Sequence, residues 1–299
     1  SIFTGMNQAV HQTNLKHFPL IARGKVRDIY QIDDSHLLFV TTDRISAFDV
    51  IMPDPVPGKG EILTQISNFW FHKSKQLINN HLTDVTLADY LSDEEFELLK
   101  NRSIIVKKLK PLPVEAIVRG YIIGSGWKDY QANGAICGIK LPTGLQLAEQ
   151  LPEAIYTPSS KADVGDHDIN ISYEETVNLI GRELAEQVRD VSLSLYKMAA
   201  EYALKRGIII ADTKFEFGLD ENNQLVLSDE VLTPDSSRFW PLDEYQIGEN
   251  PVSFDKQFIR DYLETLNWNK TAPGPTIPEE VIKKTQQKYL EAFDILTAE

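Results

Sequence analysis

The segment DTKFEFGLDENNQLVLSDEVL, residues 212–232, carries the pattern that decides the fold of this chain. It predicts two antiparallel strands joined by the polar turn DENNQ at residues 220–224. Side chains alternate between the two faces of a strand, so Thr213, Phe215 and Phe217 are expected to enter a core. The opposite, polar face then carries Asp212, Lys214 and Glu216.

This hairpin brings acidic side chains together, and their placement depends on the turn. If the turn is centred between Asn222 and Asn223, Glu216 lies opposite Asp229. Directly opposed carboxylates lie about 5 Å apart and repel each other, and a divalent cation removes that repulsion. Mg²⁺ suits the position because it prefers one or two carboxylates together with phosphate oxygens and water. Glu216 and Asp229 are therefore the predicted metal ligands, and the alternative is a hairpin whose charges face solvent.

The segments on both sides of the hairpin predict a mixture of strands and helices. A helical region is predicted from a capping box at Ser172 and Glu175 to Arg206, with an interruption at Gly181. Strands are predicted at residues 26–32, 37–42, 103–109, 114–123 and 208–211. Further helices are predicted at residues 63–79, 254–266 and 279–296, and an extended surface loop at residues 141–162.

The composition excludes several classes of protein. The chain has 299 residues, a length that favours two lobes, and Pro111 with Pro113 suggests a hinge between them. A formal net charge of −14 disfavours non-specific binding to nucleic acid. We expect no membrane span and, from residues 1–18, no secretory signal. The single cysteine, Cys137, is expected to be a buried or half-buried apolar residue in a reducing cytoplasm.

An acidic chain binds anions through local clusters, and the first cluster is RGKVRDIY at residues 23–30. Gly24 allows close approach of the backbone to a ligand, and the cations of Lys25 and Arg27 suit a polyphosphate. The segment lacks the spacing of a Walker loop. The alternative is ordinary surface charge at the start of a strand.

Two further clusters suit a smaller anion. VRGYIIGSGW at residues 118–127 predicts a strand, a turn and a helix that begins near Trp127. Arg119, Ser125 and the free amides of a helix start are what a monophosphate needs. TPDSSRFW at residues 233–240 adds Arg238 directly after the acidic hairpin. The alternatives are a capped strand–turn–helix and a surface loop.

Two polar segments complete the candidates, TDRISAFD at residues 42–49 and the stretch from 159 to 168, which contains His167. A lone histidine in a loop is usually only solvated. The sequence has no histidine pair at zinc spacing, no G-x-S-x-G nucleophile elbow and no cysteine nucleophile with a partner.

Taken together, these motifs resemble the phosphoribosylaminoimidazole-succinocarboxamide synthase (SAICAR synthetase) family. The resemblance covers roughly residues 20–296 and is similar to the longer form of the family, with extra C-terminal helices. The blocks that carry it are GKVRDIY at 24–30, TDRISAFD at 42–49, VRGYIIGSGW at 118–127, TPSSKADVGDHDINIS at 157–172, ADTKFEFG at 211–218 and DEVLTPDSSRFW at 229–240.

The resemblance implies both a fold and a reaction. The fold is α+β and two-lobed, with an N-terminal antiparallel β lobe over a larger α+β lobe, as in kinases and ATP-grasp enzymes. The implied divisions are 1–110 for the ATP-covering lobe, 111–250 for the lobe that binds ATP, Mg²⁺ and the nucleotide substrate, and 251–299 for C-terminal helices that pack on the lobes. The reaction joins L-aspartate to the carboxylate of carboxyaminoimidazole ribonucleotide (CAIR) through an acyl phosphate, with ATP converted to ADP and phosphate.

The resemblance also implies roles for particular residues. Glu216 and Asp229 would hold Mg²⁺ against the ATP phosphates. Lys214 would face the transferring group, and Asp212 would orient Lys214 or contact the substrate. Residues expected to contact ATP are Gly24, Lys25, Val26, Arg27, Lys108, Leu109, Lys110 and Glu230. Residues expected to hold the ribose phosphate of the substrate are Arg119, Ser125 and Arg238. Candidates for aspartate recognition and loop closure are Asp43, Arg44, Ser46, Asp49, Lys161, His167 and Asp168.

Two rival functions remain open at the level of sequence. The same acidic hairpin, together with the glycine-containing segment at residues 23–30, would also bind ATP in another ATP-dependent enzyme, such as a small-molecule kinase. A catalytically silent nucleotide-binding regulator is the second rival, but it is expected to lack Lys214, Glu216 or Asp229. The expected partners are the small molecules CAIR, L-aspartate and ATP, with no nucleic acid and no membrane, in a monomer or small homo-oligomer.

Overall fold

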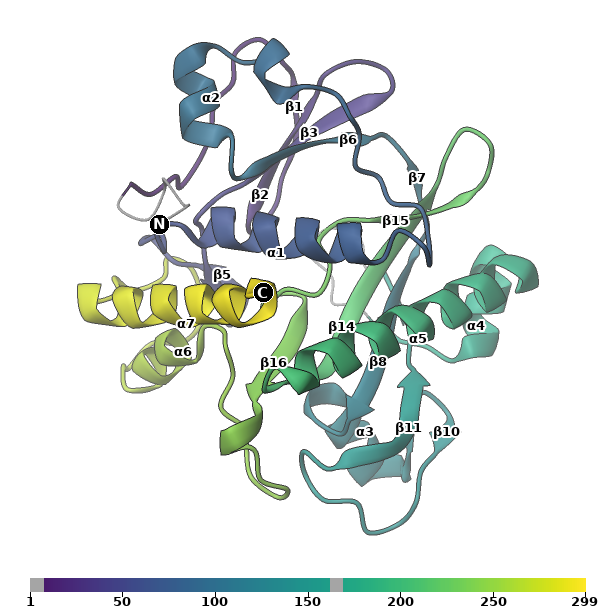
Figure 1. Ribbon diagram of the computed structural model, residues 1–299. Coiled ribbons are helices and arrows are strands. Elements are labelled where there is room, and N and C mark those ends of the chain that lie inside the picture. The colour runs from purple at the N-terminus through teal and green to yellow at the C-terminus, as the bar shows by residue number, and fades with distance from the viewer. Residues whose placement is uncertain (1–7, 162–168) are drawn as a thin grey trace. The chain divides into compact units, whose positions relative to one another are not determined.

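Figure 1 shows the computed structural model of the chain, which describes residues 8–161 and 169–299. The chain divides into two compact units. The terminal unit comprises the chain up to Phe69 together with His81–Lys108 and Phe254–Glu299. The central unit comprises Trp70–Asn80 and Leu109–Ser253. Both units combine helices with mainly antiparallel sheets, so the predicted α+β class is confirmed.

The terminal unit is built on an antiparallel sheet with the strand order β1-β2-β3-β6. Its strands are β1 Leu20–Arg23, β2 Arg27–Gln31, β3 His36–Thr41 and β6 Ser103–Lys107. Tyr30 of β2, Leu38 and Val40 of β3 and Ile105 of β6 are buried in one core cluster. These side chains recur at every second position, so one face of the sheet is filled by aromatic and branched residues that favour strands.

Helices from distant parts of the sequence complete the terminal unit. Its other elements are β4 Ser46–Ala47, β5 Val50–Ile51, α1 Lys59–Lys73 as far as Phe69, η2 Leu87–Asp89, α2 Asp93–Leu99, α6 Gln257–Glu264 and α7 Glu279–Thr297. α6 and α7 pack on each other (Figure 1, yellow). Gln286 Nε2 of α7 donates a hydrogen bond to Pro57 O at 2.6 Å, and the Lys59 ammonium lies 5.7 Å from the ring centroid of Tyr289. The C-terminal helices therefore belong to the same unit as the N-terminal sheet.

The central unit is built on a larger sheet with the strand order β13-β12-β8-β14-β15. β11 also pairs with β8, and β7 and β16 pair with β14. Its elements are β7 Lys110–Pro111, β8 Val114–Tyr121, α3 Gly124–Asn133, β9 Ala135–Ile136, β10 Ile139–Lys140, β11 Gln150–Tyr156, β12 Ser159–Ser160, β13 Ile169–Asn170, α4 Tyr173–Ile180, α5 Arg182–Lys205, β14 Ile208–Leu219, β15 Leu225–Ser228, β16 Ser237–Pro241 and η3 Leu242–Glu244.

α5 covers one face of the central sheet, across β8 and β14 (Figure 1). Its buried residues recur at helical spacing and include Ala185, Val188, Leu195 and Ala199, which form the stripe that an amphipathic helix turns toward a core. The predicted interruption at Gly181 is confirmed, because α4 ends and α5 begins on either side of it. Across the described ranges, every helix is too short or too polar to cross a bilayer.

The prediction of a surface loop at residues 141–162 is wrong from residue 150 to residue 160, because this part adds strands to the central sheet, whereas residues 141–149 form neither strand nor helix. β11 pairs with β8 so that Ile155 lies opposite Arg119, and Ser159 of β12 lies opposite Glu115. The proline and glycine content favoured a loop, but Pro152 falls where the β11–β8 register shifts. A proline is tolerated at such a bulge because no ladder donor is required there.

Two predicted helix boundaries also differ. α1 spans Lys59–Lys73 rather than residues 63–79, and Leu77, which lies within the predicted range, is outside the helix and exposed. α3 begins at Gly124 rather than at Trp127, so the Gly-Ser-Gly sequence forms its first turn. This earlier start brings Ser125 and the first helical amides next to the end of β8.

Candidate active site

Charged side chains of β8 and β14 gather on one face of the central sheet, which we call the site face. The two strands are antiparallel, with Asp212 opposite Arg119 and Lys214 opposite Ile117. Because side chains alternate along a strand, every second residue of each strand reaches this face. The charged members of the site face are Glu115, Arg119, Asp212, Lys214 and Glu216.

Arg119 is the buried cation of the site face. Its Nε donates a hydrogen bond to Thr157 Oγ1 at 2.8 Å, and its Nη2 donates to Ser125 Oγ at 3.1 Å. Burial lowers the pKa of the Arg119 guanidinium, and the neighbouring Asp212 carboxylate opposes that shift. A buried charge is tolerated where its polar atoms are paired, so the two hydroxyls fix Arg119 at the start of α3.

Asp212 ties a second arginine to the same place. Arg238 Nη1 lies 2.6 Å from Asp212 Oδ2, and Arg119 Nη1 lies 4.0 Å from the same oxygen. Asp212 therefore contacts both guanidinium groups, whereas the sequence had assigned it to Lys214 or to the substrate. Two positive charges against one negative charge leave an excess of positive charge, which suits a phosphate group.

The first turn of α3 comes close to these arginines. Gly124 has a φ of 60°, and a Cβ built on it would lie 2.3 Å from Arg238 Nη2. Only glycine combines this left-handed conformation with such a close approach. The amides of a helix start carry partial positive charge and bind anions. We call the arrangement of Arg119, Ser125, Asp212, Arg238 and this helix start the anion corner.

Lysine and glutamate pairs occupy the rest of the site face. Lys214 Nζ lies 3.5 Å from Glu115 Oε1, and Lys161 Nζ lies 3.1 Å from Glu216 Oε1. Ser159 Oγ donates to the second oxygen of Glu115 at 3.4 Å. Sequence reasoning missed Glu115 and Thr157. The signal for Glu115 was its spacing, because it stands four residues before Arg119 on one strand and so shares its face.

The predicted register of the acidic hairpin is wrong by one residue. Glu216 pairs with Ser228, not with Asp229. The turn between β14 and β15 contains an odd number of residues, because Asn223 adopts a left-handed conformation with a φ of 58°. Asp220 Oδ1 also accepts hydrogen bonds from the amides of Asn222 and Gln224 within this turn. Asp229 follows the last residue of β15 and has a φ of 65°, so the alternation of a regular strand ends there.

The donor chemistry of this region fits Mg²⁺. Glu216 carries a carboxylate on the site face, where it already has a cationic partner in Lys161. Asp229 stands one residue beyond the strand partner of Glu216. Within residues 8–161 and 169–299, no group of three or more histidine, cysteine, aspartate or glutamate side chains is arranged to enclose a metal. Mg²⁺ does not need such a cage, since it keeps waters and binds substrate phosphates.

In the terminal unit, the predicted polyphosphate segment forms a tight turn between β1 and β2. Gly24 N donates to Arg27 O at 2.8 Å. Lys25 Nζ lies 2.8 Å from Asp49 Oδ1, and both side chains are exposed. The Arg27 guanidinium lies 4.9 Å from the ring centroid of Phe39. The backbone oxygen of Val26 accepts a hydrogen bond from Thr42 N at 2.9 Å, which anchors the turn.

Asp43 and Arg44 are buried and bound within the terminal unit. Asp43 accepts hydrogen bonds from both terminal nitrogens of Arg102, at 2.8 and 3.2 Å, and from the amides of Val10 and Gly60. Arg44 is 3% exposed, and its Nη2 donates to Gly24 O and to Asp28 Oδ1, each at 2.9 Å. The Arg44 contact supports the backbone of the turn at Gly24, and the Asp43 contacts hold Arg102 and the amides of Val10 and Gly60.

The other predicted residues lie in several places. Ser46 O accepts a hydrogen bond from Lys256 Nζ, and Lys108 N donates to Ser35 O at 2.8 Å. Leu109 and Lys110 stand at the start of the longer segment of the central unit, and Lys110 of β7 pairs with Leu219 of β14. Glu230 Oε2 accepts from Thr233 Oγ1 at 2.6 Å. His167 and Asp168 lie outside the described residues.

Cys137 is half-buried in the central unit, as expected. Burial raises the pKa of its thiol to about 11, although the Arg119 charge opposes the shift. A thiol that stays protonated at neutral pH is a poor nucleophile.

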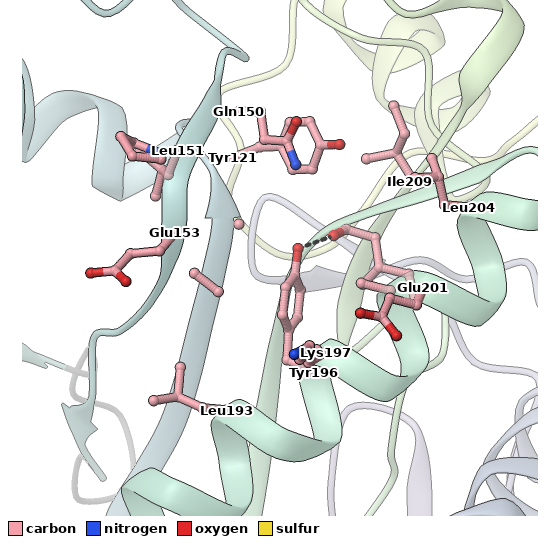
Figure 2. A pocket seen from close by; sticks show the side chains of 15 residues that line it. Tyr121, Gln150, Leu151, Glu153, Leu193, Tyr196, Lys197, Glu201, Leu204 and Ile209 are labelled. Carbon is pink, nitrogen blue, oxygen red and sulfur yellow. Dashed lines mark hydrogen bonds between the residues drawn. The ribbon is translucent and has the colours of Figure 1, made fainter.

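A pocket of about 520 Å³ lies behind the sheet, between β11 and α5 (Figure 2). Its wall includes Gly120 and Tyr196, and Tyr196 Oη donates a hydrogen bond to Ile210 O at 2.6 Å. Gly120 follows Arg119 on β8, so it faces away from the site face. A Cβ on Gly120 would lie 1.9 Å from Tyr196 Oη, which shows how closely this phenol packs on the strand. The pocket is therefore separate from the anion corner.

The fold and the anion corner together define an α+β protein in which two arginines and a helix start gather on one face of a sheet. The SAICAR synthetase family model matches residues 20–275. This chain belongs to the SAICAR synthetase family.

Individual relatives agree along nearly the whole chain. A phosphoribosylaminoimidazole-succinocarboxamide synthase of Thioalkalivibrio sulfidiphilus is 62% identical over 293 residues, which are 98% of this chain and 99% of that protein. The SAICAR synthase of Saccharomyces cerevisiae, solved in complex with SAICAR, has a TM-score of 0.91 and 46% identity, and the match covers 97% of this chain and 99% of that one. A SAICAR synthetase solved in complex with ADP has a TM-score of 0.68 and 26% identity, covering 93% and 97%.

Proposed function

We propose that this chain is the ATP-dependent ligase that joins L-aspartate to the carboxylate of CAIR, giving SAICAR, ADP and phosphate in purine biosynthesis. The observation that carries the proposal is the anion corner, in which two arginines, a serine and a helix start converge on a space suited to the ribose phosphate. Membership of the SAICAR synthetase family supports the same substrate class.

The chemistry begins with a carboxylate, which is a poor electrophile because it is already anionic. Transfer of the γ-phosphoryl group breaks its bond to ADP and forms an acyl phosphate on CAIR. The amine of aspartate then attacks the acyl carbon, loses a proton, and expels phosphate as the carbon–oxygen bond breaks. The protein has mainly to position the reactants and to neutralise crowded negative charge. Lys214 is the cation that we assign to the transferring group.

ATP binding is assigned to two groups of residues. Gly24, Lys25, Val26 and Arg27 contact the phosphates, and their tight turn with exposed cations supports that role. Lys108, Leu109, Lys110 and Glu230 remain candidates for the adenosine part. Glu216 and Asp229 would hold Mg²⁺, which when bound neutralises charge on the phosphate oxygens.

The assignment of aspartate-binding residues needs revision. Asp43 and Arg44 have buried charged atoms that are bound to neighbours, so we assign Arg44 to supporting the turn at Gly24 and Asp43 to holding Arg102. Ser46, Asp49, Lys161, His167 and Asp168 remain candidates for aspartate recognition. The cytoplasmic location and the oligomeric state, monomer or small homo-oligomer, stay predictions.

Substrate omission tests the proposed reaction against its two rivals. With ATP, Mg²⁺, CAIR and aspartate together, we expect SAICAR and ADP to form in equal amounts. Leaving out either CAIR or aspartate should stop ADP formation, apart from slow leakage. Full ADP formation with CAIR but without aspartate would favour a kinase, and nucleotide binding without any turnover would favour a regulator.

The assignment of Glu216 is tested by Glu216→Gln, which removes the charge and keeps the shape. We expect Mg²⁺-dependent SAICAR formation to fall by at least about 10²-fold, since loss of one preorganised electrostatic contact has that cost in other enzymes. Glu153→Gln is the matched control, because Glu153 is exposed on β11 at the rim of the rear pocket. Near-normal turnover in Glu216→Gln, with a thermal unfolding curve like the wild type, would remove Glu216 from the metal role.

A further inference from the structure

Glu115 is a nearly buried carboxylate on the site face, and the mechanism above gives it no task. It lies on β8 and is 8% exposed. Burying a carboxylate is costly unless its oxygens are paired. One oxygen lies 3.5 Å from the Lys214 ammonium, and the other accepts a hydrogen bond from Ser159 at 3.4 Å. The sheet thus places a negative charge beside the one lysine that we assign to phosphoryl transfer.

Lys214 needs such a neighbour because its side chain is flexible. A lysine ammonium is a point charge at the end of four rotatable bonds, and it has no fixed geometry of its own. The Lys214 side chain is 40% exposed, so packing alone leaves it room to move. A carboxylate fixed on the neighbouring strand limits the directions in which the ammonium can point.

A second lysine, Lys161, reaches the site face from the residue that follows β12, and it has a different partner. Lys161 pairs with Glu216 at 3.1 Å, so each of these lysines has its own glutamate. Lys214 stands between Asp212 and Glu216 on its face of β14, and both of those acids have cationic partners of their own in Arg238 and Lys161. Glu115, on the neighbouring strand β8, is therefore the acid that we take as the partner of Lys214.

We propose that Glu115 is the positioning residue for Lys214, holding its ammonium where negative charge develops on the transferring phosphoryl group. This inference rests on the proposed function, in which Lys214 faces that group. Preorganised charge accelerates a reaction because no reorientation is required at the moment of transfer. Loss of Glu115 should therefore slow the chemical step and leave substrate binding largely intact.

A purely structural role makes a different prediction. If Glu115 serves only to receive the Ser159 hydroxyl and so join β8 to β12, a neutral acceptor of the same shape is sufficient. Glu115→Gln provides that acceptor and removes only the charge next to Lys214. A structural role therefore predicts normal kcat for Glu115→Gln.

The test is a double-mutant cycle of Glu115→Gln and Lys214→Met, with SAICAR formation measured at varied CAIR and ATP. We expect Glu115→Gln to lower kcat by about 10- to 100-fold, the size of one charge-assisted contact, with KM for CAIR within about threefold of the wild type. The double variant should be no slower than Lys214→Met alone, because the two residues act as one. Glu153→Gln again serves as the matched control.

Two results would overturn the inference: normal kcat in Glu115→Gln, or losses from the two changes that multiply in the double variant. Should Glu115→Gln fail to fold, Glu115→Asp enters the same cycle, since it keeps the charge but withdraws it by one methylene. A wild-type chain that makes no SAICAR contradicts the proposed function and the inference together. A wild-type chain that makes SAICAR, with Glu115→Gln equally fast, contradicts the inference alone.

Discussion

Asp212 accounts for how two arginines can stay close together in the anion corner. Like charges repel, and the repulsion is stronger where little water is present. The carboxylate of Asp212 lies 2.6 Å from Arg238 and 4.0 Å from Arg119, so it offsets this repulsion before any substrate arrives. The hydroxyl of Thr157 then gives Arg119 a fixed direction, because it receives the Nε hydrogen bond at 2.8 Å.

The first prediction concerns this hydroxyl. Thr157→Val keeps the shape of a fully buried side chain and leaves Arg119 Nε without its acceptor. Hydrogen bonds to charged groups contribute about 1.5–3 kcal/mol, so we expect the Kd for CAIR to rise roughly 10- to 100-fold with a smaller change in kcat. Titration calorimetry with CAIR measures this.

Thr176→Val is the control, because Thr176 is also buried in the central unit and its hydroxyl bonds to Tyr173 O on α4. The control should lose stability and keep its affinity for CAIR. Equal Kd values for Thr157→Val and the wild type would show that Thr157 does not orient Arg119.

At the scale of single residues, the sequence offered candidates where the residue type alone suggests the chemistry. Arg119, Arg238 and Ser125 could be singled out because cations and a hydroxyl near glycines suit an anion. Thr157 could not be singled out, and for Glu115 the sequence offered only its four-residue spacing from Arg119, because their partners Arg119 and Lys214 lie on other segments of the chain. Those contacts depend on the strand register, which no local pattern specifies.

Among the elements, the start of α3 matters most to the site. Its first residue, Gly124, combines a left-handed backbone with direct packing against Arg238. The same helix ends at Gly134, which is also left-handed, with a φ of 67°, but a Cβ at this position would meet no atom within 4 Å. Both ends of α3 thus require a left-handed backbone, but only Gly124 lies in contact with the anion corner.

The second prediction compares these two glycines. Gly124→Ala and Gly134→Ala should each lose about 1–2 kcal/mol of stability, because alanine is strained in a left-handed conformation. Only Gly124→Ala should also weaken CAIR binding, since its Cβ would lie 2.3 Å from Arg238 Nη2 and force the guanidinium to move. Denaturant unfolding and CAIR titration on both variants measure the two effects. A similar loss of affinity in Gly134→Ala would mean that helix strain, not displacement of Arg238, weakens binding.

At the level of secondary-structure elements, the sequence predicted the long periodic helices correctly, and the predictions failed at turns and bulges. The helices from 182 to 205 and from 279 to 297 have strong apolar periodicity, and both were predicted. The hairpin register was missed because one left-handed residue, Asn223, makes the turn odd-numbered. β11 was missed because its proline resembles a loop signal, while its pairing with β8 is a long-range contact.

For the molecule as a whole, stability depends on charged and titratable groups that are buried in the terminal unit. Arg102 pairs with Asp43, and Arg44 pairs with Asp28. Such pairs are weak sources of net stability, but removing one partner leaves an uncompensated charge. His81 adds a group whose charge state changes with pH.

The third prediction concerns His81, which is buried with its ring edge on Phe39. Burial lowers the pKa of His81 to about 3, and the charge of Arg27 adds to the shift. Because the folded value lies below the unfolded value of 6.5, the unfolded state binds the proton first as pH falls. His81 should therefore cost the folded state up to about 1.4 kcal/mol per pH unit below pH 6.5, down to about pH 3.

Urea unfolding at about pH 7, 6 and 5 tests this, with His81→Phe compared with the wild type. The variant should lose stability less steeply as pH falls. His72→Phe is the control, because His72 is exposed on α1, and its slope should match the wild type. Parallel slopes for the His81 variant and the wild type would contradict the prediction.

The packing of Tyr196 against Gly120 joins the two sides of the central sheet. Its hydroxyl occupies the place that any side chain at position 120 would need, and it holds the backbone of β14 two residues before Asp212. A side chain can therefore be added at position 120 of β8 only if Tyr196, which packs on the face opposite the site face, is first replaced by a smaller residue. Mutational libraries that vary position 120 but keep Tyr196 will therefore recover only glycine there.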